Sequence, residues 1–272
     1  MPRVRSLQHV LIGATAALLV GSLVMPGHAE SGPVTAAAVA YARGETRTLD
    51  VAGAVRARRV ARSDAETALE ALEASVRETS HPQALADAFR SYFAYRAAHP
   101  KAATNPYLYF VDYGLPSTTP RGYVFDMQSL SVVDGPFTVA HGRGSLASSD
   151  GVPHRFSNAH GSAATSLGLF VAQELYAFRG TSNGRAYRSV GLRLAGVSGA
   201  FNGNARTRGV VAHGAPYVTA ANAGRSEGCP AVEPERAERL LPKLAHGGMV
   251  FLFAPDEHWM ARDPWLTAAA QG

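Results

Sequence analysis

The pattern of apolar and polar positions divides the chain into a helical part and, from about residue 105, a part built of short strands. Leu69, Leu72 and Val76 recur at spacings of three and four residues, which predicts a helix over Asp64–Glu78. A second apolar stripe predicts another helix between residues 80 and 100, where a proline in the first turn is tolerated and His99-Pro100 ends the pattern.

Beyond residue 105 the chain consists of short runs rich in Val, Tyr, Phe and Leu, separated by Gly, Pro, Ser or Asn. Such runs are typical of strands in an antiparallel or mixed sheet. A helical pattern then covers Glu233–Leu244 and precedes a buried strand over Met249–Phe253, while the segment after Pro255 is expected to be peripheral. The other expected strands are Tyr107–Asp112, Gly122–Asp126, Ser131–Val139, Ser166–Phe178, Ser189–Leu194 and Val210–His213.

The first residues have the layout of a secretory signal peptide. Arg3 and Arg5 precede an uncharged run over Val10–Met25, and small residues before and at Ala29 offer a cleavage site. The run has 16 residues, fewer than the roughly 20 that a membrane span needs. We therefore expect residues 1–29 to be a signal peptide, with a retained anchor as the alternative and no stable membrane span after cleavage. Either way the protein is periplasmic or exported.

Composition narrows the function classes. The net charge of +5 comes from basic residues spread along the chain, and the stretch over Val55–Arg62 is expected to be a solvated linker or helix face. Basic blocks interleaved with aromatic residues are missing, which argues against a nucleic-acid partner. A single cysteine excludes a disulfide framework and a cysteine-rich zinc finger.

The chemistry concentrates around that cysteine, Cys229. His213 lies 16 residues upstream, and each residue stands beside a glycine. A thiol becomes a good nucleophile when an imidazole accepts its proton. Gly228 lets the backbone turn so that successive N–H groups can point at one oxygen, and the helix predicted from residue 233 favours a thiolate near its N-terminus. The alternative from residue type alone is a buried, inert cysteine.

Ser226-Glu227-Gly228-Cys229 matches an S-x-G-C signature, with His213-Gly214 upstream. In these motifs the chain resembles the YkuD-like L,D-transpeptidases, and above all the murein L,D-transpeptidase catalytic domain family. The resemblance extends over Leu85–Pro255, and Glu227 departs from it because a bulky or basic residue is usual at that position. Further matching segments are Val139–Ser145, Phe156–Asn158, Ser166–Gly168, Leu192–Leu194, Phe201-Asn202, Arg225-Ser226 and Gly228–Ala231.

The resemblance implies a mainly β (α+β) catalytic domain, a sandwich or mixed sheet with a helix after the cysteine. The expected organisation is a signal peptide (1–29), a linker and helical segment (30–84), the catalytic domain (85–255) and a C-terminal tail (256–272). The resemblance also implies a cysteine acyl-enzyme formed with a peptidoglycan stem peptide and transferred to an amine acceptor. No cofactor is expected, and no metal, because no ligand set has the spacing of a zinc site. Transfer to water, as in an L,D-carboxypeptidase or amidase, is the alternative on the same substrate.

Residue roles follow from the same resemblance. Cys229 corresponds to the nucleophile and His213 to the base, with the Gly214 carbonyl orienting the imidazole. Oxyanion donors are expected from the N–H groups of Gly228 and Cys229. The expected substrate-binding residues are Arg225 as a carboxylate donor, Ser226 as a hydroxyl that orders the loop, His141 in the cleft wall, and Asn202.

Three other functions remain open from the sequence. Gly224-x-Ser226-x-Gly228 matches the nucleophile elbow of a serine hydrolase, although Pro230 would break the helix that should follow. A zinc-dependent wall peptidase would draw on His141, Asp150, His154 and His160, but the H-E-x-x-H pattern is missing. A non-catalytic wall-binding module would leave Cys229 without a chemical role.

Overall fold

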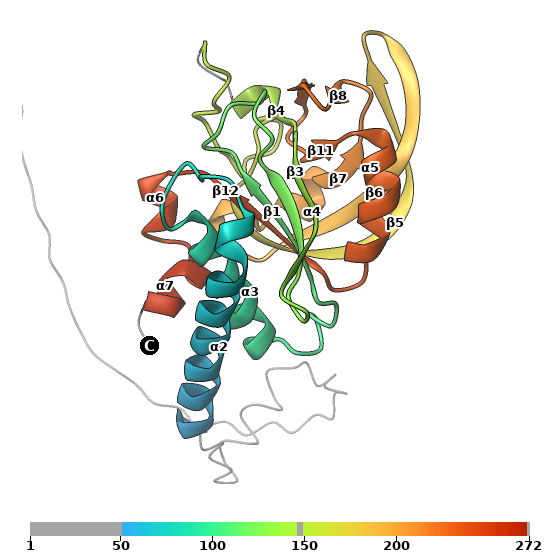
Figure 1. The fold of residues 1–272 in the computed structure, drawn as a ribbon. Helices are drawn as coiled ribbons and strands as arrows, with labels where there is room; N and C mark the ends of the chain where they lie inside the picture. Colours follow the sequence, from blue (N-terminus) through green and yellow to red (C-terminus); the bar gives the residue numbers. More distant parts are fainter. Residues whose placement is uncertain (1–50, 146–148, 271–272) are drawn as a thin grey trace, which may run out of the picture. The chain divides into compact units, whose positions relative to one another are not determined.

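The fold is built on a mixed eight-stranded sheet, seen in a computed structural model that describes residues 51–145 and 149–270 (Figure 1). The strand order is β11-β7-β6-β5-β12-β1-β2-β3, with parallel pairs at β1–β12 and β7–β11 and antiparallel pairs elsewhere. This architecture confirms the expected α+β fold class. The strands are β1 Tyr107–Asp112, β2 Gly122–Asp126, β3 Ser131–Phe137, β5 Gly168–Ser182, β6 Arg185–Gly196, β7 Val211–Gly214, β11 Ala231–Val232 and β12 Met249–Phe253.

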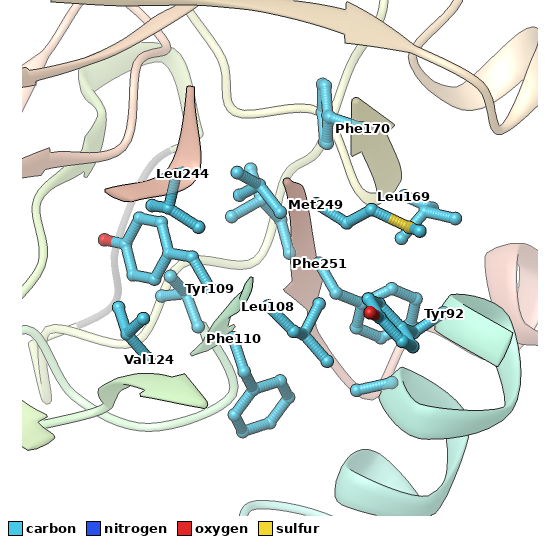
Figure 2. Close-up of a cluster of buried hydrophobic side chains, with 14 of the residues drawn as sticks. Tyr92, Leu108, Tyr109, Phe110, Val124, Leu169, Phe170, Leu244, Met249 and Phe251 are labelled. Carbon is cyan, nitrogen blue, oxygen red and sulfur yellow. The ribbon is translucent and has the colours of Figure 1, made fainter. Parts of the chain in front are cut away.

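Helices cover both faces of the sheet at its centre. Leu108 pairs with Met249, and these side chains share the face that packs on α3 (Ala84–Ala98). Tyr109 points to the opposite face and lies beside Leu244 of α5 (Pro234–Leu244), as Figure 2 shows. A strand buried on both faces has no polar side to alternate with, which is why β1 and β12 are nearly continuous apolar runs.

The first helix is longer than its periodicity predicts. The structure has α2 over Val51–Leu72, so the helix begins 13 residues before Asp64 and includes the basic stretch over residues 55–62. Alanine and arginine are strong helix formers, and this composition carries the helix through a segment without an apolar stripe. Its second half is anchored by alanines such as Ala65 and Ala68, which are buried against α3. A 3₁₀ turn over Glu73–Ser75 follows.

The C-terminal segment is part of the core, contrary to the expectation that it is peripheral. It forms α6 (Glu257–Met260) and α7 (Pro264–Ala270). Trp259 is 1 % exposed, and its indole N–H donates to the fully buried carboxylate of Asp263 at 2.8 Å. Trp265 donates from its indole to the carbonyl of Val197 at 2.8 Å. Two tryptophans with satisfied N–H groups therefore fasten this segment to the sheet and to α3.

The long hairpin β5–β6 extends beyond both predicted strands. Its turn is Asn183-Gly184, with φ of +50° and +74°. Positive φ at both central residues is the signature of a type I′ turn, whose twist suits two long paired strands. In Figure 1 this hairpin is the curved yellow ribbon beside β7 and β8 (Val218–Thr219).

The predicted signal peptide and the linker up to residue 50 lie outside the described residues. Among residues 51–145 and 149–270, no helix is long and apolar enough to cross a membrane. The domain boundaries stay a prediction.

The buried carboxyl group of Asp87 on α3 makes the stability of the fold depend on pH. The residue is 7 % exposed, and burial raises its pKa from 3.8 to about 6 even though Arg90 lies 3.6 Å away. The folded state therefore binds this proton more tightly than the unfolded state, so stability falls as pH rises through about 4 to 6. We expect Asp87→Asn to stabilise the fold by about 1–2 kcal/mol at pH 8 and to change little at pH 4.

Thermal unfolding at the two pH values measures this effect. Asp64→Asn, on the exposed side of α2, is the control and should shift neither melting temperature. A lower melting temperature of Asp87→Asn at pH 8 would show that the ion pair with Arg90 outweighs the cost of burying the carboxylate.

Candidate active site

The edge of the sheet brings His213 and Cys229 together. Strand β11 pairs in parallel with β7, with Ala231 opposite His213, and the ladder continues through the His213 N–H to the Pro230 carbonyl at 3.4 Å. Side chains alternate along extended chain, so Cys229, two residues before Ala231, shares a face with His213. The strand register thus predicts that the two side chains are diagonal neighbours across the strand pair.

The imidazole of His213 is held in one tautomer. Its Nδ1 lies 3.0 Å from the Gly214 carbonyl, and because a carbonyl only accepts, Nδ1 carries the hydrogen and Nε2 keeps its lone pair. Phe178 stacks on the ring with centroids 4.1 Å apart and planes 15° from parallel. Burial lowers the pKa of His213, although the Gly214 hydrogen bond opposes the shift. The ring is therefore neutral at pH 7 and can accept a proton at Nε2.

Gly214 leaves no room for a side chain. A Cβ there would lie 2.3 Å from the Ser189 hydroxyl oxygen and 2.9 Å from Cα of Pro234. The close approach of β6 and the start of α5 thus requires glycine at the residue whose carbonyl orients His213.

Cys229 is partly exposed as a residue, and its thiol donates to the Gly209 carbonyl at a sulfur–oxygen distance of 4.0 Å. Burial raises its pKa to about 11, against the lowering effects of the Val211 N–H and the Arg208 guanidinium. Glu227 adds a smaller raising effect, in the direction expected for a carboxylate at that position. The resting thiol is therefore protonated at neutral pH and needs a base to react.

A compact turn carries the cysteine. The Ser226 hydroxyl donates to the Cys229 carbonyl at 2.7 Å and accepts from the Gly228 N–H at 3.1 Å. Gly228 has a φ of +119°, and a Cβ there would lie 2.8 Å from the Ala164 carbonyl oxygen. Ser226 thus orders the turn from a buried position, and the next helix begins only at Pro234, unlike a nucleophile elbow.

The same turn separates the two expected oxyanion donors. The Gly228 N–H is directed to Ser226, whereas the Cys229 N–H makes no hydrogen bond with any residue in the described part of the chain. Only the Cys229 N–H is therefore available to a developing oxyanion in this conformation.

His141, expected in the cleft wall, is buried. It lies on β4 (His141–Gly142), which pairs with β10 (Arg225–Ser226), and its side chain is 0 % exposed. The buried guanidinium of Arg121 donates to its Nδ1 at 3.0 Å. Burial, together with Arg121 and Arg225, lowers the pKa of His141 to about 3. His141 is thus buried on the strand that pairs with Arg225-Ser226, the start of the cysteine turn.

Asn202 is also buried, at 0 % exposure, which leaves it no surface for a substrate. Its side chain accepts from the Ser198 N–H at 2.7 Å and donates to the Leu169 carbonyl at 2.8 Å. These bonds fix the segment that follows β6, a structural role that differs from the expected substrate contact.

Arg225 is the expected substrate-binding residue that faces solvent. Its Nη1 makes long contacts of 3.2–3.3 Å with the Ser117 hydroxyl and with two carbonyls of its own loop. The neighbouring Glu227 pairs with Arg143 at 2.7 Å, with both side chains mostly exposed. The guanidinium of Arg225 can therefore reach a ligand carboxylate without breaking an ion pair.

Three residues at this site escaped the sequence analysis: Arg121, Phe178 and Arg208. Arginine usually lies at the surface, so nothing in the local pattern marks Arg121 as buried. In the described part of the chain, no three His, Cys, Asp or Glu side chains are grouped so that they could hold a metal ion.

Comparisons with known proteins relate the chain to one family. The family model of the L,D-transpeptidase catalytic domain matches residues 77–253. No curated protein sequence matches the chain significantly.

Solved structures similar to the chain include an L,D-transpeptidase from Mycobacterium smegmatis, with 14 % identity and a TM-score of 0.33. That alignment covers 55 % of this chain and 59 % of the other. An L,D-transpeptidase from Mycobacterium tuberculosis H37Rv aligns with 18 % identity and a TM-score of 0.31, over 54 % of this chain and 57 % of the other. The chain thus spans somewhat more than half the length of these structures.

Gly228 offers a test of the turn. In Gly228→Ala the left-handed backbone costs about 1–3 kcal/mol, and the new methyl group also meets the Ala164 carbonyl. Gly184→Ala in the hairpin turn is the matched control, because its φ is +74° and its Cβ would meet nothing within 4 Å. We expect both variants to lower the melting temperature, but only Gly228→Ala to change the rate at which iodoacetamide alkylates Cys229. Equal alkylation rates in the wild type, Gly228→Ala and Gly184→Ala would contradict the tight turn around Gly228.

Proposed function

The chain belongs to the family of L,D-transpeptidase catalytic domains, and we propose that it is a peptidoglycan L,D-transpeptidase with Cys229 as nucleophile and His213 as base. The observation that carries the proposal is the sheet-edge register of Ala231 opposite His213, together with a neutral imidazole whose Nδ1 carries the hydrogen. Family membership supplies the reaction class, and this geometry supports the assignment of residues.

The first half-reaction begins with a protonated thiol. As Sγ attacks the carbonyl carbon of a stem-peptide amide beside an L-centre, Nε2 of His213 takes the thiol proton and the carbonyl becomes an oxyanion. The free Cys229 N–H is suited to bind that oxyanion. When the intermediate collapses, the C–N bond breaks, His213 protonates the leaving amine, and a thioester on Cys229 remains.

In the second half-reaction an acceptor amine attacks the thioester. His213 takes the proton of that amine, the C–S bond breaks, and the thiolate recovers the proton, so the enzyme returns to its starting state. The product is a new amide, which is a cross-link when the acceptor is another stem peptide. Water in place of the amine gives L,D-carboxypeptidation through the same acyl-enzyme. Arg225 is the candidate to bind a carboxylate of the substrate.

Such a substrate lies outside the cytoplasm, in agreement with the signal peptide predicted for residues 1–29. The proposal therefore includes action in the periplasm or at the cell surface on peptidoglycan stem peptides, without a cofactor.

Substitution of the nucleophile tests the proposal directly. Cys229→Ala and Cys229→Ser should both abolish turnover of purified muropeptides measured by mass spectrometry, because thiolate chemistry drives acylation. Ser226→Ala should keep part of the activity, since it loses only the hydroxyl that orders the turn. An active Cys229→Ala together with an inactive Ser226→Ala would favour the serine hydrolase.

The base is tested by single-turnover acylation of Cys229 with a carbapenem or a tetrapeptide stem. His213→Gln should slow acylation by roughly 10²–10⁴-fold, the usual contribution of a general base. Because the pKa of His213 is lowered, the wild-type rate should fall only below pH 6.5, where protonation removes the lone pair.

His141→Gln is the control for that measurement. It removes the buried imidazole to which Arg121 donates. It should therefore lower the melting temperature while changing the acylation rate little. If His141→Gln abolished acylation while His213→Gln left it intact, the two histidines would have to exchange roles.

A further inference from the structure

Arg208 is a cation that pairs with no anion among the described residues, and it lies close to the candidate nucleophile. It ends the short helix α4 (Ala205–Arg208) and is half-buried. Its Nη1 donates to the Ser157 carbonyl at 2.8 Å and to the Ser166 hydroxyl, and its Nη2 donates to the Ala164 carbonyl at 2.8 Å and the Ser162 hydroxyl at 3.1 Å. All four acceptors are neutral, and no carboxylate in the described residues pairs with it.

The guanidinium lies against the turn that carries Cys229. Its Nη2 is 3.5 Å from the point where a Cβ on Gly228 would stand. The next residue, Gly209, supplies the carbonyl that accepts the Cys229 thiol hydrogen. The Ala164 carbonyl oxygen bonded by Arg208 is also the atom that a Cβ on Gly228 would meet first, at 2.8 Å. Arg208 thus contacts both the turn and the segment packed against it.

Neutral oxygens satisfy the N–H groups of a guanidinium, but they do not neutralise its charge. A cation held partly out of water beside a thiol stabilises the thiolate more than the thiol. We propose that Arg208 is a positioning residue that stabilises the thiolate of Cys229 and holds residues 157–166 against the nucleophile turn. The inference rests on the proposed function in that it assigns the thiolate a role in catalysis.

The other charged and titratable groups around Cys229 do not supply this effect. The carboxylate of Glu227 acts in the opposite direction and is paired with Arg143. His213 is neutral at pH 7, because burial lowers its pKa. Four tyrosines also interact with the thiol, and each has a raised pKa and is uncharged at neutral pH: Tyr113, Tyr176, Tyr187 and Tyr217.

Arg206 is a matched control on the same helix. It is exposed, and it bonds to the Glu174 carboxylate at 2.9 Å and the Gln173 side chain at 2.7 Å. Removing its charge changes the formal charge of α4 as much as removing that of Arg208, without altering a contact of the cysteine turn.

The experiment measures the thiol itself. Because the chain has one cysteine, the pH dependence of iodoacetamide alkylation reports on Cys229 alone. In the full chain, Arg208→Gln should raise the thiol pKa by about 0.5–1 unit. It should also slow alkylation at pH 8 by about 2–5-fold, since a smaller thiolate fraction is partly offset by higher nucleophilicity. Arg206→Gln should leave both quantities at the wild-type value.

Arg208→Lys separates charge from structure. Lysine keeps the charge but cannot make the four hydrogen bonds, so the melting temperature should fall while the thiol pKa stays near the wild-type value. A pKa that is unchanged in a folded Arg208→Gln overturns the proposal. If only Arg208→Lys folds, a raised thiol pKa despite the retained charge overturns it equally.

Alkylation uses no wall substrate, so this result is independent of the proposed activity. A wild-type protein inactive on muropeptides, with the expected shift in Arg208→Gln, would refute the transpeptidase and leave the thiolate effect standing. A wild type that is active on muropeptides, with no shift of the thiol pKa in Arg208→Gln, would support the transpeptidase and refute the thiolate effect.

Discussion

The site depends on the parallel pairing of two very short strands at the edge of the sheet. Strand β11 has two residues and β7 has four, yet the register of Ala231 opposite His213 decides where the thiol lies relative to the imidazole. A slip of one residue would move Cys229 to the other face, because side chains alternate along extended chain. Strand β7 packs on α5, whose start lies against Gly214, and this contact supports the short pairing.

Electrostatics at the site follows from burial. Loss of water contact raises the pKa of the thiol and lowers that of the imidazole, so both groups rest in their neutral forms. A neutral pair places no charge in the low-dielectric interior. In the proposed mechanism the proton moves as a substrate carbonyl accepts the developing charge. Among the described residues, the Cys229 N–H makes no hydrogen bond and Arg208 pairs with no carboxylate, and both groups lie at the turn that carries the thiol.

Buried polar side chains support the turn that carries Cys229. Arg121 and His141 are fully buried, and the guanidinium of Arg121 donates a hydrogen bond to the imidazole of His141 on β4. A buried guanidinium costs free energy unless its donors are satisfied, and Arg121 reaches two backbone carbonyls in addition to the imidazole. The pair holds the backbone next to Ser226, Gly228 and Cys229. We therefore expect it to position these residues rather than to react.

The sequence by itself determined the buried strands β1, β2 and β12 to the residue, because apolar runs bounded by turn residues are a local signal. It also singled out Cys229, His213 and the glycine beside each, because reactive residues next to required glycines stand out along the chain. Tertiary structure decided what local patterns cannot encode: the burial of His141 and Asn202, the docking of Trp259 and Trp265, and the position of Arg208. Each depends on a partner distant in sequence, and whether a polar side chain faces solvent or the core is set only when those partners meet.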